Sequence, residues 1–416
     1  MPQNTAKIDV IDMPMGAGKT NGMIAYMNAH PENKYLFVTP YRTERKRIQD
    51  ACPSLNFFIP DNEYSKLTEC QDFILQGKNI ATTHALFSRF NSETMSILRQ
   101  QEYILIIDEE PDCIFEILSM STDDYQMLAN GGYIELSEQD KQLFIVEYNQ
   151  YSGVVSTYRK MRDYIDSRNF YLVDDLNYDA HNIGIIGVMK PEIFTCFKQI
   201  FLLTYLFRDS NYDCYCRFWN IEYCNHYFDG ENLEEGRFDD REFRRTANSL
   251  INLLEHSKLN FREYDVNKNP DAVTLSKSWY RDATNGGLRR IKRNASNYVR
   301  NKMHSRQAET MWSTYKDWKD EMSGNGCYAR SFVPCNCRAT NQYRNKKTLV
   351  YLLNLYPNPF LIRWLNKNGI TVNQDHFPLT MLLQWVFRSQ IRDGKEINLY
   401  LPAFRMREIL KRYLAD

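Results

Sequence analysis

The chain opens with short, apolar-rich runs of strand length that alternate with polar stretches of helical character. Four runs stand out: IDVIDM (8–13), KYLFVTP (34–40), NIATTHALF (79–87) and YILIIDEEPD (103–112). Within them YLFV and YILII are apolar at every position, which is typical of parallel strands covered on both faces. The stretches that begin at Asn21 and at RTERKRIQDA (42–51) predict helices between them. The first third of the chain therefore predicts an α/β domain with a parallel sheet.

From 113 to about 198 the alternation is less regular, which predicts an insertion of helical and mixed structure. A helix is expected over 140–165, and strands over 169–173 and 183–189. The apolar run IFLLTYLF (200–207) then returns to the first sheet. We expect the insertion to be an accessory part that contacts nucleic acid or a partner protein.

The next change is one of charge. The stretch 229–242 holds seven carboxylates and two arginines, which predicts a solvated segment and an acidic linker over 229–256. A second α/β pattern follows and closes with a strand at EINLYLP (396–402) and a helix at RMREILKRYL (405–414). The predicted organisation is a first domain at 1–228, the linker, and a second domain at 257–416.

Composition limits the class of protein. A chain of 416 residues exceeds one ordinary core, so two or three domains are expected. A formal net charge of zero excludes a uniformly basic coat for nucleic acid but leaves local basic patches open. No apolar run has the length of a membrane span, and the start lacks a secretory pattern. We expect a cytoplasmic protein whose ten cysteines are reduced.

The first chemical motif is MPMGAGKT (13–20), which lies between the first predicted strand and the first predicted helix. Gly16 and Gly18 allow the backbone to approach a phosphate, and the amides at a helix start attract an anion. In such a loop Lys19 reaches the β- and γ-phosphates, and the hydroxyl of Thr20 binds magnesium. Met13 stands where the usual G-x-x-x-x-G-K-[ST] loop has its first glycine.

The second motif, ILIIDEEP (104–111), places acids at the end of an apolar strand. A phosphoryl-transfer site needs one carboxylate to hold the metal ion and a second to activate water. Asp108 is the candidate for the first role and Glu109 the candidate general base.

These motifs together resemble those of superfamily 2 (DEAD/DEAH-like) helicases. PMGAGKT (14–20) is similar to the family loop P-T-G-x-G-K-T, in which the glycine lies closer to the lysine, and 108–111 is similar to the D-E-x-x box. The resemblance implies two RecA-like domains in tandem, with ATP and Mg²⁺ bound in the cleft between them. It implies Mg²⁺ ligation by Thr20 and Asp108, and nucleotide contacts from Met15, Gly16, Ala17, Gly18, Lys19 and Thr20.

Further segments match the family more loosely. VTPYRTE (38–44) and ATTHALF (81–87) resemble the segments that grip a nucleic-acid backbone, and LLTYLF (202–207) falls where the family has its S-A-T segment. In the last of these Thr204 matches, whereas 205 and 206 depart from the pattern. The backbone contacts implied by the resemblance are Thr39, Arg42, Thr82 and Thr83.

In the second domain, QWVFRSQIRDGK (384–395) resembles the final helicase motif Q-x-x-G-R-x-x-R. Gln384 and Arg388 match, Phe387 replaces the glycine, and Arg392 comes one residue late. The resemblance makes Arg388 the expected arginine finger. A spacing of four residues would let Arg388 and Arg392 share a helix face.

CRATNQY (337–343) is similar to the penultimate helicase motif, with Thr340 and Asn341 near nucleotide or nucleic acid. Several stretches of the C-terminal part also resemble helicase-like proteins of phages and mobile elements. If a phage encodes the protein, the host bacterial cytoplasm is its expected location.

A basic cluster precedes these motifs. GGLRRIKRNASNYVRNKMHSR (286–306) has seven lysines and arginines and no acid, with Tyr298 among them. This pattern fits a track for a nucleic-acid backbone and equally a solvated basic helix. The candidate contacts are Arg289, Arg290, Lys292 and Arg293.

The stretch CYCRFWNIEYCNHYF (214–228) offers Cys214, Cys216, Cys224 and His226 as possible zinc ligands. Their spacing is not that of the usual C-x₂-C pairs. Alternation with period two on a strand is the preferred interpretation, with the cysteines as half-buried small apolar residues.

The sequence thus predicts a Mg²⁺-dependent ATPase that acts as a helicase or translocase on nucleic acid, DNA rather than RNA, in replication, recombination or remodelling. A replication or recombination protein is a possible partner. Two alternatives stay open: a motor that remodels without unwinding, and a nucleic-acid-binding switch gated by ATP. Neither the polarity of movement nor the oligomeric state follows from these residues.

Overall fold

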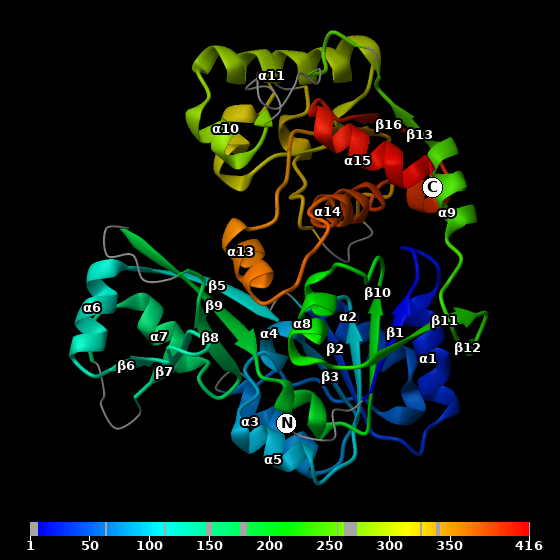
Figure 1. Cartoon of the computed structure of the whole chain (residues 1–416). Coiled ribbons are helices and arrows are strands. Elements are labelled where there is room, and N and C mark those ends of the chain that lie inside the picture. The colour runs from blue at the N-terminus through cyan, green and yellow to red at the C-terminus, as the bar shows by residue number, and fades with distance from the viewer. Residues whose placement is uncertain are drawn as a thin grey trace. The chain divides into compact units, whose positions relative to one another are not determined.

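The first predicted strand lies inside a seven-stranded sheet with the order β12-β11-β1-β10-β4-β2-β3 (Figure 1). Every pairing in it is parallel except that of β11 with β12. The interior positions of β2, β4 and β10 are fully buried, as their unbroken apolar runs predict. β1 is buried as well, although Asp9, which is 7% exposed, interrupts its apolar run. The strands are β1 (Ile8–Asp12), β2 (Tyr35–Thr39), β3 (Ile80–Thr83), β4 (Ile104–Asp108), β10 (Gln199–Thr204), β11 (Tyr223–Asp229) and β12 (Asn232–Glu235).

The computed structural model describes residues 7–62, 65–111, 114–146, 152–174, 181–255, 257–261, 273–324, 327–337 and 342–415. The chain forms two compact units. Unit 1 comprises Met1–Met13, Ala17–Phe238 and Asn358–Val372, and unit 2 comprises Pro14–Gly16, Asp239–Pro357 and Asn373–Asp416.

Helices cover both faces of the seven-stranded sheet. Apolar side chains of α1 and α2 pack on one face, and those of α3, α4, α5 and α8 pack on the other. These helices are α1 (Lys19–Ala29), α2 (Arg42–Ala51), α3 (Lys66–Leu75), α4 (His84–Phe87), α5 (Ser92–Leu98) and α8 (Asn211–Trp219), with short 3₁₀ turns at η1 (Pro53–Leu55) and η2 (Pro191–Cys196).

The predicted insertion is a five-stranded antiparallel sheet with the order β5-β9-β8-β7-β6 and two helices. The helix expected over 140–165 is wrong in its first part, because QLFI forms a strand that pairs with β6 and β8; a helix occupies only Ser156–Asp163. The elements are β5 (Phe115–Ser121), α6 (Thr122–Asn130), β6 (Ile134–Leu136), β7 (Gln142–Ile145), α7 (Ser156–Asp163), β8 (Arg168–Leu172) and β9 (Asn182–Met189).

A helix from the second half of the sequence, α13 (Pro359–Lys367), packs within unit 1. Its Trp364 is buried, with its ring centroid 6.0 Å from that of Phe115, 5.6 Å from that of Tyr171 and 4.7 Å from that of Phe218. Phe115 and Tyr171 belong to the insertion and Phe218 to α8. The insertion therefore shares a core with the seven-stranded sheet and is not a separate accessory body.

Unit 2 contains a four-stranded parallel sheet with the order β13-β16-β15-β14. Its strands are β13 (Ile251–Leu253), β14 (Thr310–Ser313), β15 (Thr348–Tyr351) and β16 (Ile397–Tyr400). Its helices are α9 (Arg241–Leu250), α10 (Lys277–Asp282), α11 (Asn285–Asn297), α12 (Lys319–Met322), α14 (His376–Val386) and α15 (Phe404–Ala415), with the π turn η4 (Tyr298–Lys302) and 3₁₀ turns η5 (Gln307–Glu309), η6 (Lys316–Trp318), η7 (Ala329–Ser331) and η8 (Gln390–Asp393).

The predicted class, two α/β domains with parallel sheets, is confirmed. The segment 229–256, expected to be a linker, instead carries regular structure: β12 extends the first sheet, and α9 and β13 belong to unit 2. Its acidic residues mark exposed faces of these elements, which is why their charge resembled that of a linker. Among the described residues no helix is both long and apolar enough to cross a membrane.

We predict that Trp364→Ala lowers the free energy of unfolding by about 3–5 kcal/mol, because it removes a buried aromatic side chain that three rings surround. Denaturant unfolding followed by tryptophan fluorescence and circular dichroism measures the change. The control is Phe144→Ala, since Phe144 is 47% exposed and its loss should cost no more than about 0.5 kcal/mol. Equal effects of the two changes would show that α13 does not share the core.

Candidate nucleotide and magnesium site

The loop after β1 has the backbone that a phosphate loop requires. Gly16 and Gly18 have φ values of 84° and 90°, in the left-handed region that favours glycine. Gly18 is the N-cap of α1, and its carbonyl accepts a hydrogen bond from the amide of Gly22 at 2.8 Å. Ala17 lies between the two glycines, and Met15 precedes them. The amides that begin α1 thus follow directly on a loop that only glycines allow to turn.

Met13, the residue that departs from the usual loop, is a structural anchor. It is buried, its amide donates to the carbonyl of Thr204 at 3.1 Å, and its sulfur lies 3.3 Å from the amide nitrogen of Phe228. Its carbonyl accepts a hydrogen bond from Nζ of Lys19 at 2.6 Å. Met13 therefore extends β1 between its neighbouring strands and holds the ammonium group of Lys19 beside the loop.

The loop and the acidic turn meet at Thr20 and Asp108. Oγ1 of Thr20 donates to Oδ1 of Asp108 at 3.3 Å, although β10 separates β1 from β4 in the sheet. Asp108 retains some exposure, but protein atoms desolvate its carboxylate, and this effect with the charge of Glu109 raises its pKa to about 7. Lys19 and the Thr20 hydroxyl act in the opposite direction.

These two side chains fit a magnesium ion. A hydroxyl and a carboxylate oxygen are hard ligands of the kind that Mg²⁺ prefers, and they already lie within hydrogen-bonding distance of each other. A nearby divalent cation favours the ionised carboxylate, which offsets the desolvation that raises the pKa of Asp108. The pair Thr20 and Asp108 is thus suited to share one cation beside the phosphate loop.

Glu109 has a φ of 62°, a left-handed conformation that is strained for a residue with a side chain. Its amide donates to the carbonyl of Leu203 in β10 at 2.9 Å, which fixes the turn at the end of β4. Strain of this kind persists only where the surroundings enforce it, and it is frequent at functional sites.

Glu110 connects the acidic turn to the segment after β10. Its carboxylate accepts from Oγ1 of Thr204 at 3.2 Å and from the amide of Tyr212 at 3.3 Å. Burial raises the pKa of Glu110 to about 7, and the hydrogen bond from Ser210 is the largest effect that opposes it. Thr204 therefore contacts the acidic turn, although the positions that follow it depart from the S-A-T pattern.

Sequence reasoning assigned no role to Glu110 or to Asp12. The carboxylate of Asp12, at the end of β1, accepts from the amides of Leu206 and Phe207 at 2.7 and 3.1 Å. The available signal was its position: like Asp108, it is an acid that ends an apolar strand.

The segments expected to grip nucleic acid lie at the same edge of the sheet, since Thr39 pairs in register with Thr83. Thr39 and Thr82 are fully buried, so their side chains pack inside the protein rather than reaching a phosphate at its surface. Thr83 caps α4 by accepting from the amide of Leu86 at 3.3 Å. Arg42, the first residue of α2, is exposed at the surface.

In unit 2, Gln384 lies on α14, but the expectation that Arg388 and Arg392 share one helix face is wrong. The helix ends at Val386, Ser389 is extended with φ −80° and ψ −171°, and Arg392 belongs to the separate turn η8. Phe387 stands where the helicase motif has a glycine, but the helix still ends before it. The amide of Arg388 donates to the carbonyl of Trp385 at 3.2 Å and closes the last turn. Thr340 and Asn341 lie outside the described residues.

The basic cluster forms α11 and η4. Arg289, Arg290 and Arg293 are exposed, whereas Lys292 is partly buried and donates to the carbonyl of Glu321 at 3.2 Å. Tyr298, which lies among these basic residues in the sequence, is buried, and its ring stacks on that of Tyr400 with centroids 4.9 Å apart. A concavity of about 350 Å³ adjoins the helix, lined by Asn285, Leu288, Arg289, Lys292 and Glu321.

The cysteines considered as zinc ligands lie on two elements. Cys214 and Cys216 are buried on α8, so the strand expected there is wrong; Ser210 caps this helix by accepting from the amide of Asp213 at 3.2 Å. Cys224 and His226 alternate on β11 as expected. In the part of the chain that the structure describes, no three histidine, cysteine or acidic side chains gather closely enough to hold a metal ion.

We predict that Gly18→Ala destabilises the protein by about 1–2 kcal/mol, because alanine is strained at a φ of 90°. No atom lies within 4 Å of a Cβ built at this position, so the cost is one of backbone conformation and not of a clash. The matched control is Gly286→Ala near the start of α11, where helix propensity should raise stability by up to about 1 kcal/mol. Equal changes in thermal unfolding would contradict the strain at Gly18.

Comparison with known proteins identifies a relative over the whole chain. The family model described as the YonV C-terminal Rossmann-like domain matches residues 245–414. The SPbeta prophage-derived uncharacterized protein YonV of Bacillus subtilis (strain 168) is 33% identical over 428 residues, with 99% of each chain covered. Its prophage origin agrees with the resemblance to proteins of phages and mobile elements.

Two solved structures give distant likenesses in shape. One is titled XPD_Helicase, with a TM-score of 0.43 and 13% identity, covering 99% of this chain and 95% of that one. The other is titled Structure of S. tokodaii Xpd4, with a TM-score of 0.41 and 12% identity, covering 98% of this chain and 94% of that one.

Because a relative at 33% identity spans the whole chain, this protein belongs to the YonV family.

Proposed function

We propose that this protein is an Mg²⁺-dependent ATPase that moves along or remodels nucleic acid, with DNA as the preferred track. The observation that carries the proposal is the contact between Thr20 and Asp108, with Lys19 held beside the same loop. This arrangement joins the parts of a phosphate loop and a metal-binding carboxylate that lie 88 residues apart in the sequence.

Each residue has a distinct proposed role. The amides from Gly16 to Thr20 and the ammonium group of Lys19 bind the β- and γ-phosphates, and Thr20 and Asp108 hold the cation. Bound Mg²⁺ supplies charge neutralisation at the transferring phosphoryl group. Glu109 orients and deprotonates the attacking water, as the second acid of the turn.

Unit 2 contributes the arginines in this proposal. Arg388 is the proposed positive partner of the developing phosphate charge, as the resemblance to superfamily 2 implies, with Arg392 and Gln384 in supporting roles. The exposed side chains of Arg289, Arg290 and Arg293 on α11 are the proposed contacts to the backbone of the nucleic acid.

The first test is NTP hydrolysis by the purified chain, alone and with single-stranded DNA, duplex DNA or RNA. We expect hydrolysis that DNA stimulates and that Lys19→Ala lowers at least about 100-fold, because an electrostatic partner of the phosphates is removed. The control is Lys34→Ala, since Lys34 precedes β2 at the opposite end of the strands from the loop, where its Nζ donates to Oε1 of Gln101 at 2.9 Å.

Two outcomes would contradict this proposal. Hydrolysis that no nucleic acid changes would favour an ATP-gated switch, and its retention in Lys19→Ala would remove the loop from the reaction. If DNA stimulates hydrolysis but a strand-displacement assay shows no product, the protein remodels without unwinding.

A second test concerns α11. We expect the double variant Arg289→Gln/Arg293→Gln to bind DNA of every sequence more weakly. The slope of the logarithm of the association constant against the logarithm of salt concentration should become shallower by about 2, because each arginine neutralises one phosphate. The control is Arg281→Gln, an exposed arginine that pairs with Asp282 at 3.1 Å. Fluorescence anisotropy across a salt series measures the slope, and a slope equal to that of the unaltered protein would exclude α11 from the track.

A further inference from the structure

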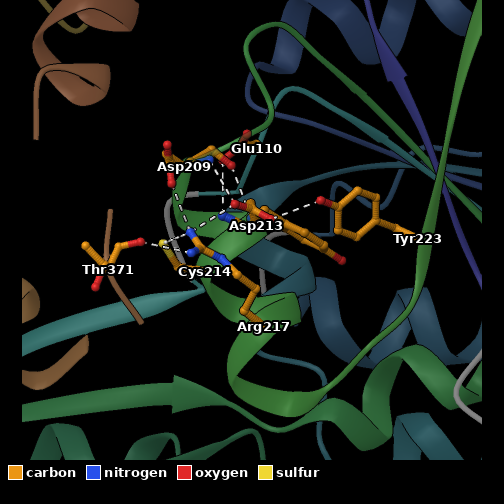
Figure 2. Close-up of polar contacts among 9 residues, drawn as sticks. Glu110, Asp209, Asp213, Cys214, Arg217, Tyr223 and Thr371 are labelled. Carbon is orange, nitrogen blue, oxygen red and sulfur yellow. Dashed lines mark hydrogen bonds and ion pairs between the residues drawn. The ribbon is translucent and has the colours of Figure 1, made fainter. Parts of the chain in front are cut away.

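A chain of polar contacts runs from the acidic turn through α8 to the segment 358–372 (Figure 2). It begins at Glu110, which accepts from the amide of Tyr212 in the first turn of α8 and from the hydroxyl of Thr204. The start of α8 is thus bound to a residue only two positions from Asp108. Displacement of the acidic turn therefore acts directly on the first turn of this helix.

The second step is Asp213, which is 3% exposed. Its Oδ2 accepts from the amide of Asp209 at 2.8 Å and lies 3.0 Å from Nη2 of Arg217, one helical turn further on. Its Oδ1 accepts from the hydroxyl of Tyr223 at 3.2 Å. A buried carboxylate with these partners fixes the direction of the Arg217 side chain.

The third step is the fork of Arg217. Nη2 also donates to Oδ1 of Asp209 at 3.2 Å, while Nη1 donates to the carbonyl of Thr371 at 3.0 Å (Figure 2). Thr371 follows α13 and lies five residues before α14, the helix that carries Gln384. One guanidinium thus joins α8 to the backbone that leads to α14.

The energy of the ion pairs alone does not explain this arrangement. The side chain of Arg217 is 35% exposed and that of Asp209 is 24% exposed, and a pair with this much exposure contributes little to stability. What a guanidinium adds is geometry, because its planar fork can hold acidic oxygens and a carbonyl in fixed directions at the same time. A lysine carries the same charge but has no such fork.

A second attachment of the same segment has no link to Glu110. Nη2 of Arg363 lies 2.8 Å from Oδ2 of Asp174, which follows β8 in the insertion, with both side chains about half exposed. It fastens α13 to the insertion and not to α8. Nζ of Lys367 lies 3.5 Å from Oδ1 of the same Asp174, so this attachment has two cations and does not involve the acidic turn, whereas the contact of Arg217 does.

We propose that Arg217 is a positioning residue that transmits the state of the acidic turn to the segment 368–372 and so couples nucleotide turnover to α14. The coupling to nucleotide turnover rests on the proposed function, whereas the contacts from Glu110 to Thr371 do not depend on it. Thr204 and Glu110 set the first turn of α8, the helix moves as one rigid element, and Arg217 carries the displacement to the carbonyl of Thr371.

The test compares Arg217→Lys with Arg363→Gln. We expect Arg217→Lys to keep basal hydrolysis and to lose about five-fold or more of its stimulation by DNA, the scale of a modest coupling energy. Lysine keeps the charge beside Asp209 and Asp213 but cannot also reach the carbonyl of Thr371 in the same fork. Arg363→Gln should leave stimulation unchanged.

Hydrogen exchange of residues 368–372 supplies a readout that does not depend on activity. In the unaltered protein we expect ADP with Mg²⁺, and the analogue AMP-PNP with Mg²⁺, to change the exchange rate of this segment; in Arg217→Lys the rate should be faster and should not respond. If Arg217→Lys does not fold, Asp209→Asn replaces it. Asparagine tolerates the φ of 66° at that position and weakens only the grip on Arg217.

The outcomes separate the two proposals. Stimulation and exchange in Arg217→Lys equal to those of the unaltered protein, or an equal loss in Arg363→Gln, would overturn the role of Arg217. Absence of DNA stimulation in the unaltered protein would overturn the proposed function alone. In that case the coupling path would still be supported if nucleotide changes the hydrogen-exchange rate of residues 368–372 in the unaltered protein but not in Arg217→Lys.

Discussion

The structure of unit 1 depends on the cost of keeping carboxylates at the ends of buried parallel strands. Asp12, Asp108 and Glu110 all lie at this edge, where burial raises the pKa of the last two to about 7. A desolvated acid must find donors. The donors here are loop amides and hydroxyls, so each acid fixes the loop that satisfies it.

This constraint explains how the loop 13–20 keeps its geometry although its sequence departs from the usual phosphate-loop motif. The usual first glycine is replaced by Met13, but Met13 takes the role of a strand residue between β10 and β11 and only then does the chain turn. The turn itself is left to Gly16 and Gly18. The departure from the common motif therefore concerns how the strand is anchored, while the residues that would face a phosphate retain their conformation.

Much of the first sheet could be predicted because its strands are apolar on both faces, a pattern that no exposed helix shares. The same reasoning failed over 140–165 and 214–216, where short runs of mixed character fit a strand or a helix equally well. In both places a partner distant in sequence contributes to the choice: β8 for the strand β7, and Glu110 for the helix α8, which Ser210 also caps locally.

The site divides along the same line. That Lys19, Thr20 and Asp108 lie near one another could be predicted because a strand, a loop and a helix place them locally; their roles stay predictions. The burial of Tyr298 could not be predicted from the sequence. An aromatic ring on a basic helix can face the core or the solvent, and here it faces the core because it stacks on Tyr400. Thr39 and Thr82 show the converse: their residue type suits a phosphate, but their position on a doubly covered strand buries them.

The segment 358–372 shows why a single cut in the sequence does not separate the two units, since it belongs to unit 1 although unit 2 precedes and follows it in the chain. Its sequence, LIRWL within a helix, predicts an amphipathic element but not the surface that it covers. The surface is made by the insertion and α8, so Trp364 completes a core that neither part closes alone. Because that core is aromatic and buried, α13 cannot shift without exposing it. The residues after α13 stay against the same core through Ile370, and next to it the hydrogen bond from Arg217 holds the carbonyl of Thr371. A change at the acidic turn would therefore reach this stretch through a polar contact that lies directly beside packed side chains.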